Sequence, residues 1–347
     1  MQTKIGIDLG DAEITVSIVG EGIVSRERSV VALRRTDGSF LGIGGDADRY
    51  EAEEGEEVAL SRIFREGVIV PEYTRAVIAR AIARHASRDT DGAVVLLSVP
   101  CSFDEVEEVA LTEMTLEAGA REAYLVYSPL AAVVGNSLDP SRSAVIVDIG
   151  SARTNILTVC HGRIFYKKTC AAAGAGFDRA IANYLLEKHK VRISRETAEI
   201  IKKKIGTVWV GNEKRYLDVR GRDVKNGDYC TARISSEEMF VALEEPMAAL
   251  IEGVCDAITK IPTDCVQDVF DTGILLAGGG ALLDGLDKMI SGVTGVDVMR
   301  LSAPGETIAL GLSGILETHT SLQAAGSPNI SRYVMKTASV PQKGMYK

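Results

Sequence analysis

Two apolar runs, KIGIDLG at residues 4–10 and AVIVDIG at residues 144–150, end in the same aspartate-x-glycine pattern. Each is followed by a polar turn and by a second run of alternating character, TVSIV or TNILTVC. Apolar runs of this length that stop at glycine are typical of buried strands. The pattern therefore predicts two similar β-hairpins that face one another, one in each half of the chain, as a weak internal repeat.

The composition is that of a globular protein with about two domains. The chain has 347 residues, of which 46% are hydrophobic, enough for two cores of ordinary size. Its 39 basic and 48 acidic residues give a formal charge of -9. Because the two signs are interleaved along the chain, no nucleic acid is expected as a partner.

The cysteines and the apolar runs indicate the cellular compartment of the protein. The six cysteines show no CxxC pair and no Cys/His ligand spacing, so we expect reduced thiols in a cytoplasm. The chain starts directly on a strand-like run without a signal peptide. No apolar run reaches the roughly 18 residues that a membrane-spanning helix needs. We therefore expect a cytoplasmic protein, with any membrane contact peripheral.

Strand-like runs alternate with amphipathic stretches, which predicts an α/β protein. The expected helices lie at about 72–85, 104–118 and from 129, and then at about 177–189, 195–204 and 236–261, with a charged β region up to about 234. The last segment is rich in Ser, Ala, Gly and Pro and has four basic residues and no acidic one. It is predicted to be a disordered tail.

A glycine-rich segment follows the last of these helices. GILLAGGGALLDGLDKMI, residues 273–290, joins an apolar run, three glycines and an amphipathic stretch. This pattern predicts a strand, a turn and a helix start, where backbone amides can approach a ligand closely. A tight turn that only needs positive φ angles is the alternative.

The two aspartate turns and the glycine turn, in this order, match the needs of a nucleotide cleft between two similar domains. Carboxylates hold Mg²⁺ through water, hairpin amides bind phosphates, and a glycine-rich helix start lies beside the nucleoside. Asp8 and Asp148 are the predicted magnesium residues. The alternative is that both are ordinary turn aspartates at strand ends.

Residues 4 to about 316 resemble the MreB-like family of bacterial actin homologues, within the superfamily of actin, sugar kinases and heat-shock chaperone ATPase domains. GRDVKNG followed by SSEEMFVALEEP is similar to the MreB-like group in particular, since the wider superfamily does not share that segment. The other segments that carry the resemblance are IGIDLG, GIVSRERSVVAL, REGVIVPEYTRAVI, VPCSFDEVEEVALTEMTLEAGAREAYLVYSPLAAVVG, VDIG, AGAGFDRAI, TAEIIKKKIG and GILLAGGGALLDGLDKMISGVTGVDV.

The resemblance implies an α/β actin-like fold, which is a duplicated ribonuclease H-like fold with two domains around a nucleotide cleft, each with a large and a small subdomain. It implies ATP with Mg²⁺ and self-association into filaments that organise wall synthesis, with conventional MreB and wall-synthesis or membrane proteins as further partners. The implied boundaries are 1–147 for domain I (small subdomain about 31–75), completed by about 316–322, then 148–315 for domain II (small subdomain about 186–244) and 323–347 for the tail.

The family's site residues carry over onto matching positions of this chain. Glu107 in VPCSFDEVEEV matches the water-orienting glutamate, although a solvated helix acid is the alternative and Glu105 and Glu108 lie close by. For AGAGFD, the alternative to a nucleotide contact is packing at a helix start. For TAEIIKKKIG, the alternative to a nucleotide contact is an ordinary exposed ion pair. The implied nucleotide-binding residues are Asp8, Gly10, Asp11, Glu13, Asp148, Gly150, Ser151, Gly174, Gly176, Asp178, Glu199, Lys202, Gly278, Gly279 and Gly280.

Both phosphate turns depart from the family pattern. The first typically reads DLGTANT but here reads DLGDAEIT, which adds the acids Asp11 and Glu13. Two like charges about 4 Å apart repel by about 4 kcal/mol at an effective dielectric of 20, so such acids weaken triphosphate binding unless they are neutralised. The second typically reads DIGGGTTDI but here reads DIGSARTNI, in which Ser151 and Ala152 replace glycines and Arg153 replaces a hydroxyl residue tied to hydrolysis.

These departures bear on catalysis more than on fold, and they predict a divergent family member with weak or absent ATPase activity. Arg153 can pair with Asp11 or Glu13 across the cleft and replace charge that Mg-nucleotide supplies. Alternatively, it can contact a γ-phosphate directly. Asn155 stands in the place of an aspartate.

The family commonly reaches membranes through an amphipathic N-terminal segment or an apolar loop before the strand at Ala93. This chain has only MQTK and RHASRDTDG at those places, so direct membrane contact is not expected, and any position at the inner membrane face is peripheral. The alternative to a filament protein is a nonpolymerising actin-like adaptor or chaperone-like ATPase that acts on conventional MreB or another partner. A sugar or acetate kinase is a weaker third reading.

Overall fold

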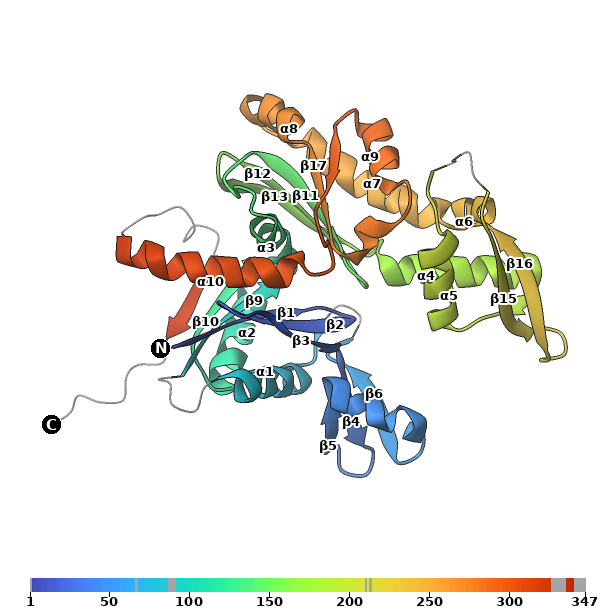
Figure 1. Ribbon diagram of the computed structural model, residues 1–347, viewed down its shortest axis with the longest axis horizontal. Coiled ribbons are helices and arrows are strands. Elements are labelled where there is room, and N and C mark those ends of the chain that lie inside the picture. The colour runs from blue at the N-terminus through green and yellow to red at the C-terminus, as the bar shows by residue number, and fades with distance from the viewer. Residues whose placement is uncertain are drawn as a thin grey trace. The chain divides into compact units, whose positions relative to one another are not determined.

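The computed structural model describes residues 2–65, 68–86, 92–209, 211, 214–325 and 335–339 (Figure 1). Residues 87–91, in the loop predicted to lack an apolar anchor, and most of the predicted tail lie outside this part. Among the described helices, none is both long enough and apolar enough to cross a membrane. The chain divides into two compact units, Met1–Pro140 with Glu306–Lys347, and Ser141–Gly305.

The first unit is built on a mixed six-stranded sheet with the order β19-β10-β9-β1-β2-β3. β1 runs antiparallel to β2 and parallel to β9, and β9 runs parallel to β10. All seven residues of β9 are buried, as expected for a central strand covered on both faces. The strands are β1 (Thr3–Leu9), β2 (Glu13–Ile18), β3 (Gly22–Arg28), β9 (Ala93–Val99), β10 (Ala120–Tyr127) and β19 (Met335–Ser339).

The helices packed on this sheet are α1 (Pro71–His85), α2 (Glu105–Glu117), α3 (Ser128–Gly135) and α10 (Thr307–Ala325). In Figure 1, α3 and α10 lie on one face of the sheet and α1 lies on the other, where it packs against α2. Local sequence explains two of the helix starts, since Pro71 opens α1 and Asp104 and Glu107 form a capping box on α2. The predicted helices of this half are confirmed.

The helices α3 and α10 cross in very close contact. A carbon atom added to Gly135 would lie 1.9 Å from the Thr307 carbonyl oxygen, and one added to Gly311 would lie 1.8 Å from the Ala131 carbonyl oxygen. The Thr307 hydroxyl also donates a hydrogen bond of 3.0 Å to the Ala132 carbonyl oxygen. Because a side chain at either glycine would overlap backbone atoms, the crossing requires glycine on both helices.

The same helix joins the end of the described chain to its first strands. The Ser17 hydroxyl on β2 donates to the Ala309 carbonyl oxygen at 2.6 Å, and Lys4 Nζ on β1 donates to the Leu316 carbonyl oxygen at 3.2 Å. These contacts place α10 in the first unit although 165 residues of the second unit, 141–305, precede it in the chain.

A small sheet with the order β5-β4-β6 adjoins the large one in this unit. Its own apolar core is formed by Val30, Ala32, Ala47 and Val58. Its elements are β4 (Val30–Arg34), β5 (Phe40–Ile43), β6 (Val58–Arg62) and the 3₁₀ segment η1 (Gly44–Glu53), and a short pair β7 (Phe64–Arg65) and β8 (Val68–Ile69) follows.

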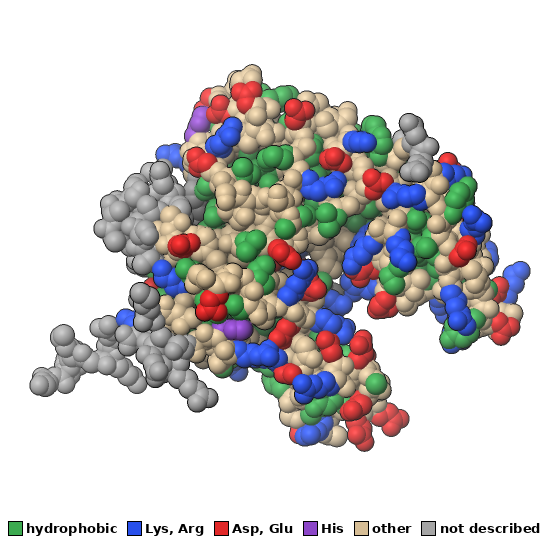
Figure 2. Space-filling view, viewed as in Figure 1, with side chains coloured by type: hydrophobic (Ala, Val, Ile, Leu, Met, Phe, Trp, Pro, Cys, Tyr) green, Lys and Arg blue, Asp and Glu red, His purple; other side chains and the backbone are tan. Residues whose placement is uncertain are grey.

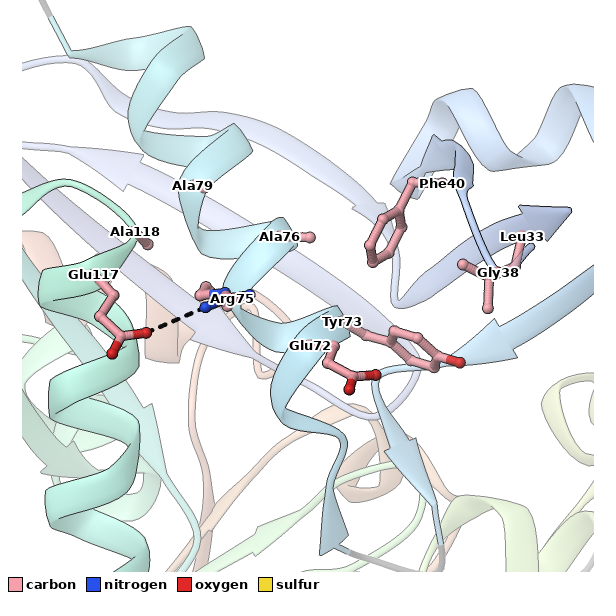
Figure 3. Close-up of a pocket in the computed structure, with 10 residues that line it drawn as sticks. All are labelled: Leu33, Gly38, Phe40, Glu72, Tyr73, Arg75, Ala76, Ala79, Glu117 and Ala118. Carbon is pink, nitrogen blue, oxygen red and sulfur yellow. Dashed lines mark hydrogen bonds and ion pairs between the residues drawn. The ribbon is translucent and has the colours of Figure 1, made fainter.

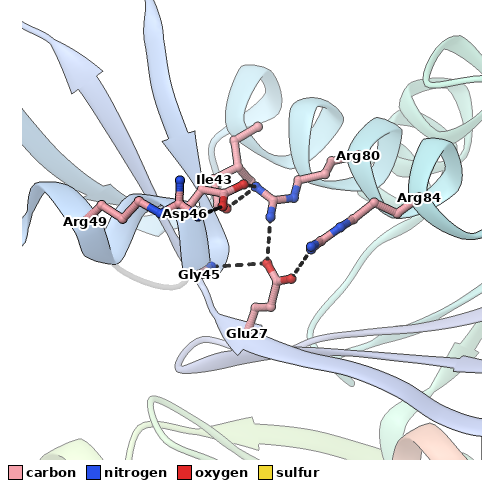
Figure 4. A network of polar contacts seen from close by, with 7 residues as sticks. All are labelled: Glu27, Ile43, Gly45, Asp46, Arg49, Arg80 and Arg84. Atoms are coloured by element: carbon pink, nitrogen blue, oxygen red, sulfur yellow. Dashed lines mark hydrogen bonds and ion pairs between the residues drawn. The ribbon is translucent and has the colours of Figure 1, made fainter.

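Charged side chains tie η1 to α1 and to β3 (Figure 4). Glu27 accepts a hydrogen bond of 3.1 Å from the Gly45 amide, and its carboxylate also contacts Arg80 at 3.4 Å and Arg84. Arg80 lies 2.7 Å from the Asp46 carboxylate. The side chains of Arg80 and Glu27 are only 19% and 22% exposed, so this network is screened less by solvent than an ordinary surface ion pair.

The second unit repeats the strand pairing of the first. Its sheet has the order β13-β12-β11-β17-β18, and β11 runs antiparallel to β12 and parallel to β17, as β1 does to β2 and β9. The predicted internal repeat is therefore present in the topology. The strands are β11 (Ala144–Ile149), β12 (Thr154–Cys160), β13 (Arg163–Cys170), β17 (Ile274–Ala277) and β18 (Val298–Arg300).

Helices of the second unit share one core with this sheet, centred on residues such as Phe177, Ile201 and Leu250. The helix predicted at 177–189 is an α-helix from Gly174 that ends in a π-helical turn. The helical elements are α4 (Gly174–Tyr184), η2 (Leu185–His189), α5 (Arg195–Ile205), α6 (Ser236–Ala242), α7 (Glu244–Thr259), η3 (Thr263–Cys265), α8 (Val266–Thr272), η4 (Gly279–Leu282) and α9 (Leu286–Thr294).

The small sheet of the second unit is formed by β14 (Val191–Arg192), β15 (Tyr216–Asp223) and β16 (Tyr229–Ser235). Basic side chains gather over it (Figure 2), where Arg220 and Arg222 stack on the Tyr229 ring, each 4.6 Å from its centre. The small sheet of the first unit carries instead a run of exposed acids at Glu51, Glu53, Glu54, Glu56 and Glu57.

The structure differs from the prediction of a disordered tail that begins at residue 323. α10 continues to Ala325, and Met335–Ser339 form β19, antiparallel to β10. Pairing with a sheet edge satisfies backbone groups whatever the side chains are, so a composition rich in Ser, Ala, Gly and Pro does not exclude it.

Replacing Gly311 with alanine is predicted to lower the melting temperature by about 5 °C or more, because overpacking costs roughly 1–3 kcal/mol and here the added carbon meets backbone. Gly314→Ala, one turn further along α10, is the matched control. Its added carbon would lie 3.3 Å from the movable Val134 Cγ1, and the better helix propensity of alanine offsets that crowding. Differential scanning fluorimetry of both variants measures the difference, and equal melting temperatures would contradict the close crossing.

Candidate functional site

The first predicted hairpin joins β1 to β2, with Asp8 at the end of the buried strand. The Ser98 hydroxyl on β9 donates a hydrogen bond of 2.5 Å to Asp8 Oδ1, which fixes that carboxylate toward the strand ends. An atom added to Gly10 would lie 2.5 Å from the Glu13 carbonyl oxygen, so the turn is tight. Asp8 and Gly10 therefore both lie in the tight turn at the end of β1.

The two acids of this turn lie beside arginines of the same unit. Glu13 pairs with Arg26 on β3 at 2.6 Å, and Arg62 on β6 donates to the Asp11 carbonyl oxygen at 3.0 Å. The predicted negative charge of Glu13 is therefore offset locally by Arg26. Because Glu13 and Arg26 are both nearly half exposed, their pair contributes little to stability and acts mainly on the local charge.

The second hairpin joins β11 to β12 and holds its aspartate in a more buried place. Asp148 is 4% exposed and accepts a hydrogen bond of 3.4 Å from the Asn155 side-chain amide, whose oxygen accepts one of 2.9 Å from Thr169. An aspartate at position 155 would place a second negative charge beside Asp148. Asn155 supplies a neutral donor instead, so the substitution lowers the negative charge of this site.

The altered turn of this hairpin is bound to the start of α4. The Gly150 amide donates to the Arg153 carbonyl oxygen at 3.0 Å, which closes the turn. The Gly174 and Ala175 amides donate to the carbonyl oxygens of Gly150 and Ser151 at 3.1 and 2.6 Å. The first amides of this helix therefore hold the hairpin in place. The next residue of the helix, Gly176, is half-buried.

A buried ion pair lies next to that helix start. Lys202 Nζ on α5 is 2.7 Å from Asp178 Oδ1 on α4 and donates to the Gly174 carbonyl oxygen at 3.1 Å. The side chains of Asp178 and Lys202 are only 5% and 15% exposed. Burial raises the pKa of Asp178, and the hydrogen bond with Lys202 opposes that rise. The lysine thus offsets part of the cost of burying this carboxylate.

Sequence reasoning missed this pair. The exposed ion pair within TAEIIKKKIG is instead between Glu199 and Lys203, at 2.7 Å, and hydrogen bonding with Lys203 lowers the pKa of Glu199. No local spacing reveals a contact between residues 178 and 202. The only available signal was that AGAGFD and TAEIIKKKIG both carried family-like residues.

The triple-glycine turn packs on the second hairpin. Gly278 has φ +77°, and an added atom there would lie 2.4 Å from the Ile149 carbonyl oxygen and 2.7 Å from Asp148 Oδ1. At Gly280 an added atom would lie 2.2 Å from Ile149 Cγ2, whereas Gly279 is exposed and has open space around it. Two of the three glycines are therefore required by close packing.

The predicted order of strand, glycine turn and helix start is present in the structure. β17 ends at Ala277, the glycines lead into the 3₁₀ segment η4, and α9 begins at Leu286, after Gly285 with φ +79°. The amides of Ala281 and Leu283 donate to the carbonyl oxygens of Gly278 and Gly280 within the turn. The first helical turn after the glycines is therefore 3₁₀, and the positive φ of Gly278 also fits the tight turn given as the alternative.

The predicted water-orienting residue, Glu107, caps α2 in the first unit. Its carboxylate accepts a hydrogen bond of 3.1 Å from the Asp104 amide, while Asp104 accepts one of 2.8 Å from the Glu107 amide. Its neighbour Glu108 accepts a hydrogen bond from the Tyr127 hydroxyl at 3.1 Å instead. Of the nearby acids, these contacts distinguish Glu107 as the residue that is held at the helix start.

A pocket of about 570 Å³ lies elsewhere in the first unit, between the β4–β5 turn, α1 and the end of α2 (Figure 3). Phe40 and Tyr73 meet edge to face in its wall, and Arg75 pairs with Glu117 at 3.3 Å. None of the predicted site residues lines this pocket. The nucleotide prediction rests on the hairpins and not on this cavity.

Comparisons with known proteins agree with these features. The cell shape-determining protein Mbl of Bacillus subtilis is 31% identical over 323 residues, which cover 92% of this chain and 97% of the relative. The cell shape-determining protein MreB of Escherichia coli is 32% identical over 328 residues, which cover 90% and 93%.

Solved structures are similar over nearly the whole chain. MreB5 of Spiroplasma citri bound to AMPPNP is 25% identical with a TM-score of 0.85, covering 94% of this chain and 99% of that one. A MamK double helical filament, 19% identical with a TM-score of 0.77 and coverage of 92% and 99%, shares the fold. The model of the MreB/Mbl protein family matches residues 2–324, and this chain therefore belongs to the MreB/Mbl family and has its actin-like fold.

Proposed function

We propose that this protein is a nucleotide-binding, filament-forming cytoskeletal protein that serves cell shape or the organisation of wall synthesis, with weak or absent ATP hydrolysis. The observation that carries the proposal is the second hairpin, which keeps Asp148 packed against Gly278 while residues 151–153 differ from the family pattern. Support comes from relatives named as cell shape-determining proteins and from MreB5 structures bound to AMPPNP and ADP.

The donor groups of both hairpins fit a magnesium nucleotide. Each hairpin offers one strand-end carboxylate, Asp8 or Asp148, and carboxylate oxygens are the ligands that Mg²⁺ prefers, directly or through water. The hairpin amides would face phosphates, and the Asp178–Lys202 pair would lie at the sugar. When bound, Mg²⁺ supplies positive charge that neutralises the phosphates.

Three features of this chain favour weak hydrolysis. Side chains at Ser151 and Ala152 limit how closely the backbone can approach a phosphate. Arg153 offers no hydroxyl group to position water. Asn155 removes one carboxylate from the vicinity of Asp148. Glu107 remains as the only family-like group for water orientation.

Restoring the family turn is predicted to raise ATP turnover. The triple variant Ser151→Gly, Ala152→Gly, Arg153→Thr should increase kcat by about tenfold or more, since a positioned proton-transfer or water-orienting group typically contributes at least that much. Arg153→Lys, which keeps the charge and adds no hydroxyl, is the control and should not increase kcat. Phosphate release from the purified chain measures both.

The proposed water-orienting role of Glu107 can be tested separately from its role in the capping box of α2. Glu107→Gln in the restored background keeps the capping box, because glutamine also serves at that position, but removes the carboxylate. The gain in kcat should then be lost without loss of helix α2. A wild-type rate equal to that of the restored variant would contradict weak hydrolysis.

Filament formation is tested by electron microscopy with ATP, without nucleotide, and with a conventional MreB added. A repeated head-to-tail contact that does not close gives open filaments, so we expect filaments with ATP. If none of the three samples contains filaments, this part of the proposal is overturned and the nonpolymerising adaptor is favoured. The altered phosphate turns are the observation that motivates this alternative.

A further inference from the structure

Two segments about a hundred residues apart meet beside the sheet of the second unit. Cys160 ends β12, His161 forms the turn to β13 with φ 47°, and Cys265 lies in η3 just before α8. They come together because α8 packs against β11, the neighbour of β12. None of the residues assigned above to nucleotide belongs to this site.

Three different ligand types converge here. The ligand atoms of His161, Asp264 and Cys265 all lie within 4.8 Å of one another, and His161 Nε2 is 3.8 Å from Asp264 Oδ2. In tetrahedral zinc sites, bonds of about 2.0–2.3 Å place neighbouring ligand atoms roughly 3.3–3.6 Å apart. The side chains of His161 and Asp264 are 58% and 75% exposed, so their rotamers are free to adjust toward a shared ion.

A second thiol lies beside this group of three. Cys160 is 6% exposed and Cys265 is 1% exposed, both are free thiols, and Cys265 is a side-chain neighbour of Cys160. Two sulfur atoms, one imidazole and one carboxylate form a donor set that suits Zn²⁺ and does not suit Mg²⁺ or Ca²⁺, which bind oxygen ligands.

The histidine also has an orienting carboxylate. The imidazole Nε2 of His161 faces Asp264, and its Nδ1 lies 3.7 Å from Asp268 Oδ2. Asp268 in turn is contacted by the Ser143 hydroxyl at 3.4 Å, and the same hydroxyl accepts a hydrogen bond of 3.2 Å from the His161 amide. A carboxylate behind a ligating imidazole is the usual arrangement around protein-bound zinc.

We propose that Cys160, His161, Asp264 and Cys265 bind one Zn²⁺ ion, which fastens the β12–β13 turn to the start of α8. A disulfide between the two thiols would need neither the imidazole nor the carboxylates gathered around them. The site is independent of the proposed nucleotide function, because its residues belong to one unit and to none of the hairpin turns.

The test uses the full chain, stripped with EDTA and kept reduced, with Zn²⁺ or Co²⁺ as the probe. We expect one Zn²⁺ per chain by elemental analysis and, with Co²⁺, the visible absorption of a tetrahedral site with a thiolate charge-transfer band. Zn²⁺ at a hundredfold excess over its Kd should raise the melting temperature by about 5 °C.

His161→Asn and Cys265→Ser should each lower zinc affinity by at least about tenfold. Asparagine tolerates the left-handed backbone at position 161, so His161→Asn keeps the test valid if the buried serine variant fails to fold. Cys230→Ser, on β16 outside the cluster, is the matched control and should bind like the wild type. Absence of stoichiometric zinc, zinc binding unchanged in His161→Asn, or a Cys160–Cys265 disulfide without zinc binding would each overturn the proposal.

Discussion

The second hairpin depends on a contact that only glycine permits. Gly278 lies against the Ile149 carbonyl and the Asp148 carboxylate, at a positive φ and with no room for a side chain. This contact joins the end of β17 to the end of β11 and thereby sets where Asp148 points. The start of α4, the Gly150 turn and the buried Asp178–Lys202 pair are arranged around the same hairpin. Substitutions at residues 151–153 leave this framework intact.

Charge within each unit is balanced close to the predicted phosphate turns. Glu13 is paired with Arg26, Asp178 with Lys202, and Asn155 replaces an acid beside Asp148. Each of these contacts reduces the dependence of the hairpins on an external cation for local neutrality. This local balance of charge is the physical basis of the proposal that the fold is kept while hydrolysis is weak.

Local chemistry made much of the fold predictable. Strand-end aspartates after apolar runs marked both hairpins, and an amphipathic stretch at about 104–118 marked α2. Contacts between distant segments were not predictable, because no spacing encodes them. The Asp178–Lys202 pair, the Cys160–Cys265 contact and the pairing of β19 with β10 all belong to this class. The glycine segment was predicted as strand, turn and helix, but its first helical turn is 3₁₀, a detail that the pattern of glycines does not encode.

The central claim is that the two hairpins bind ATP through Asp8 and Asp148, with affinity weakened by the altered turns. Calorimetric titration of the full chain with ATP, with and without Mg²⁺, tests it most directly. We expect a Kd in Mg²⁺ that is weaker than about 10 μM, and loss of the Mg²⁺ dependence in Asp148→Asn. Binding tighter than about 1 μM, or binding in Asp148→Asn that depends on Mg²⁺ as in the wild type, would contradict the account.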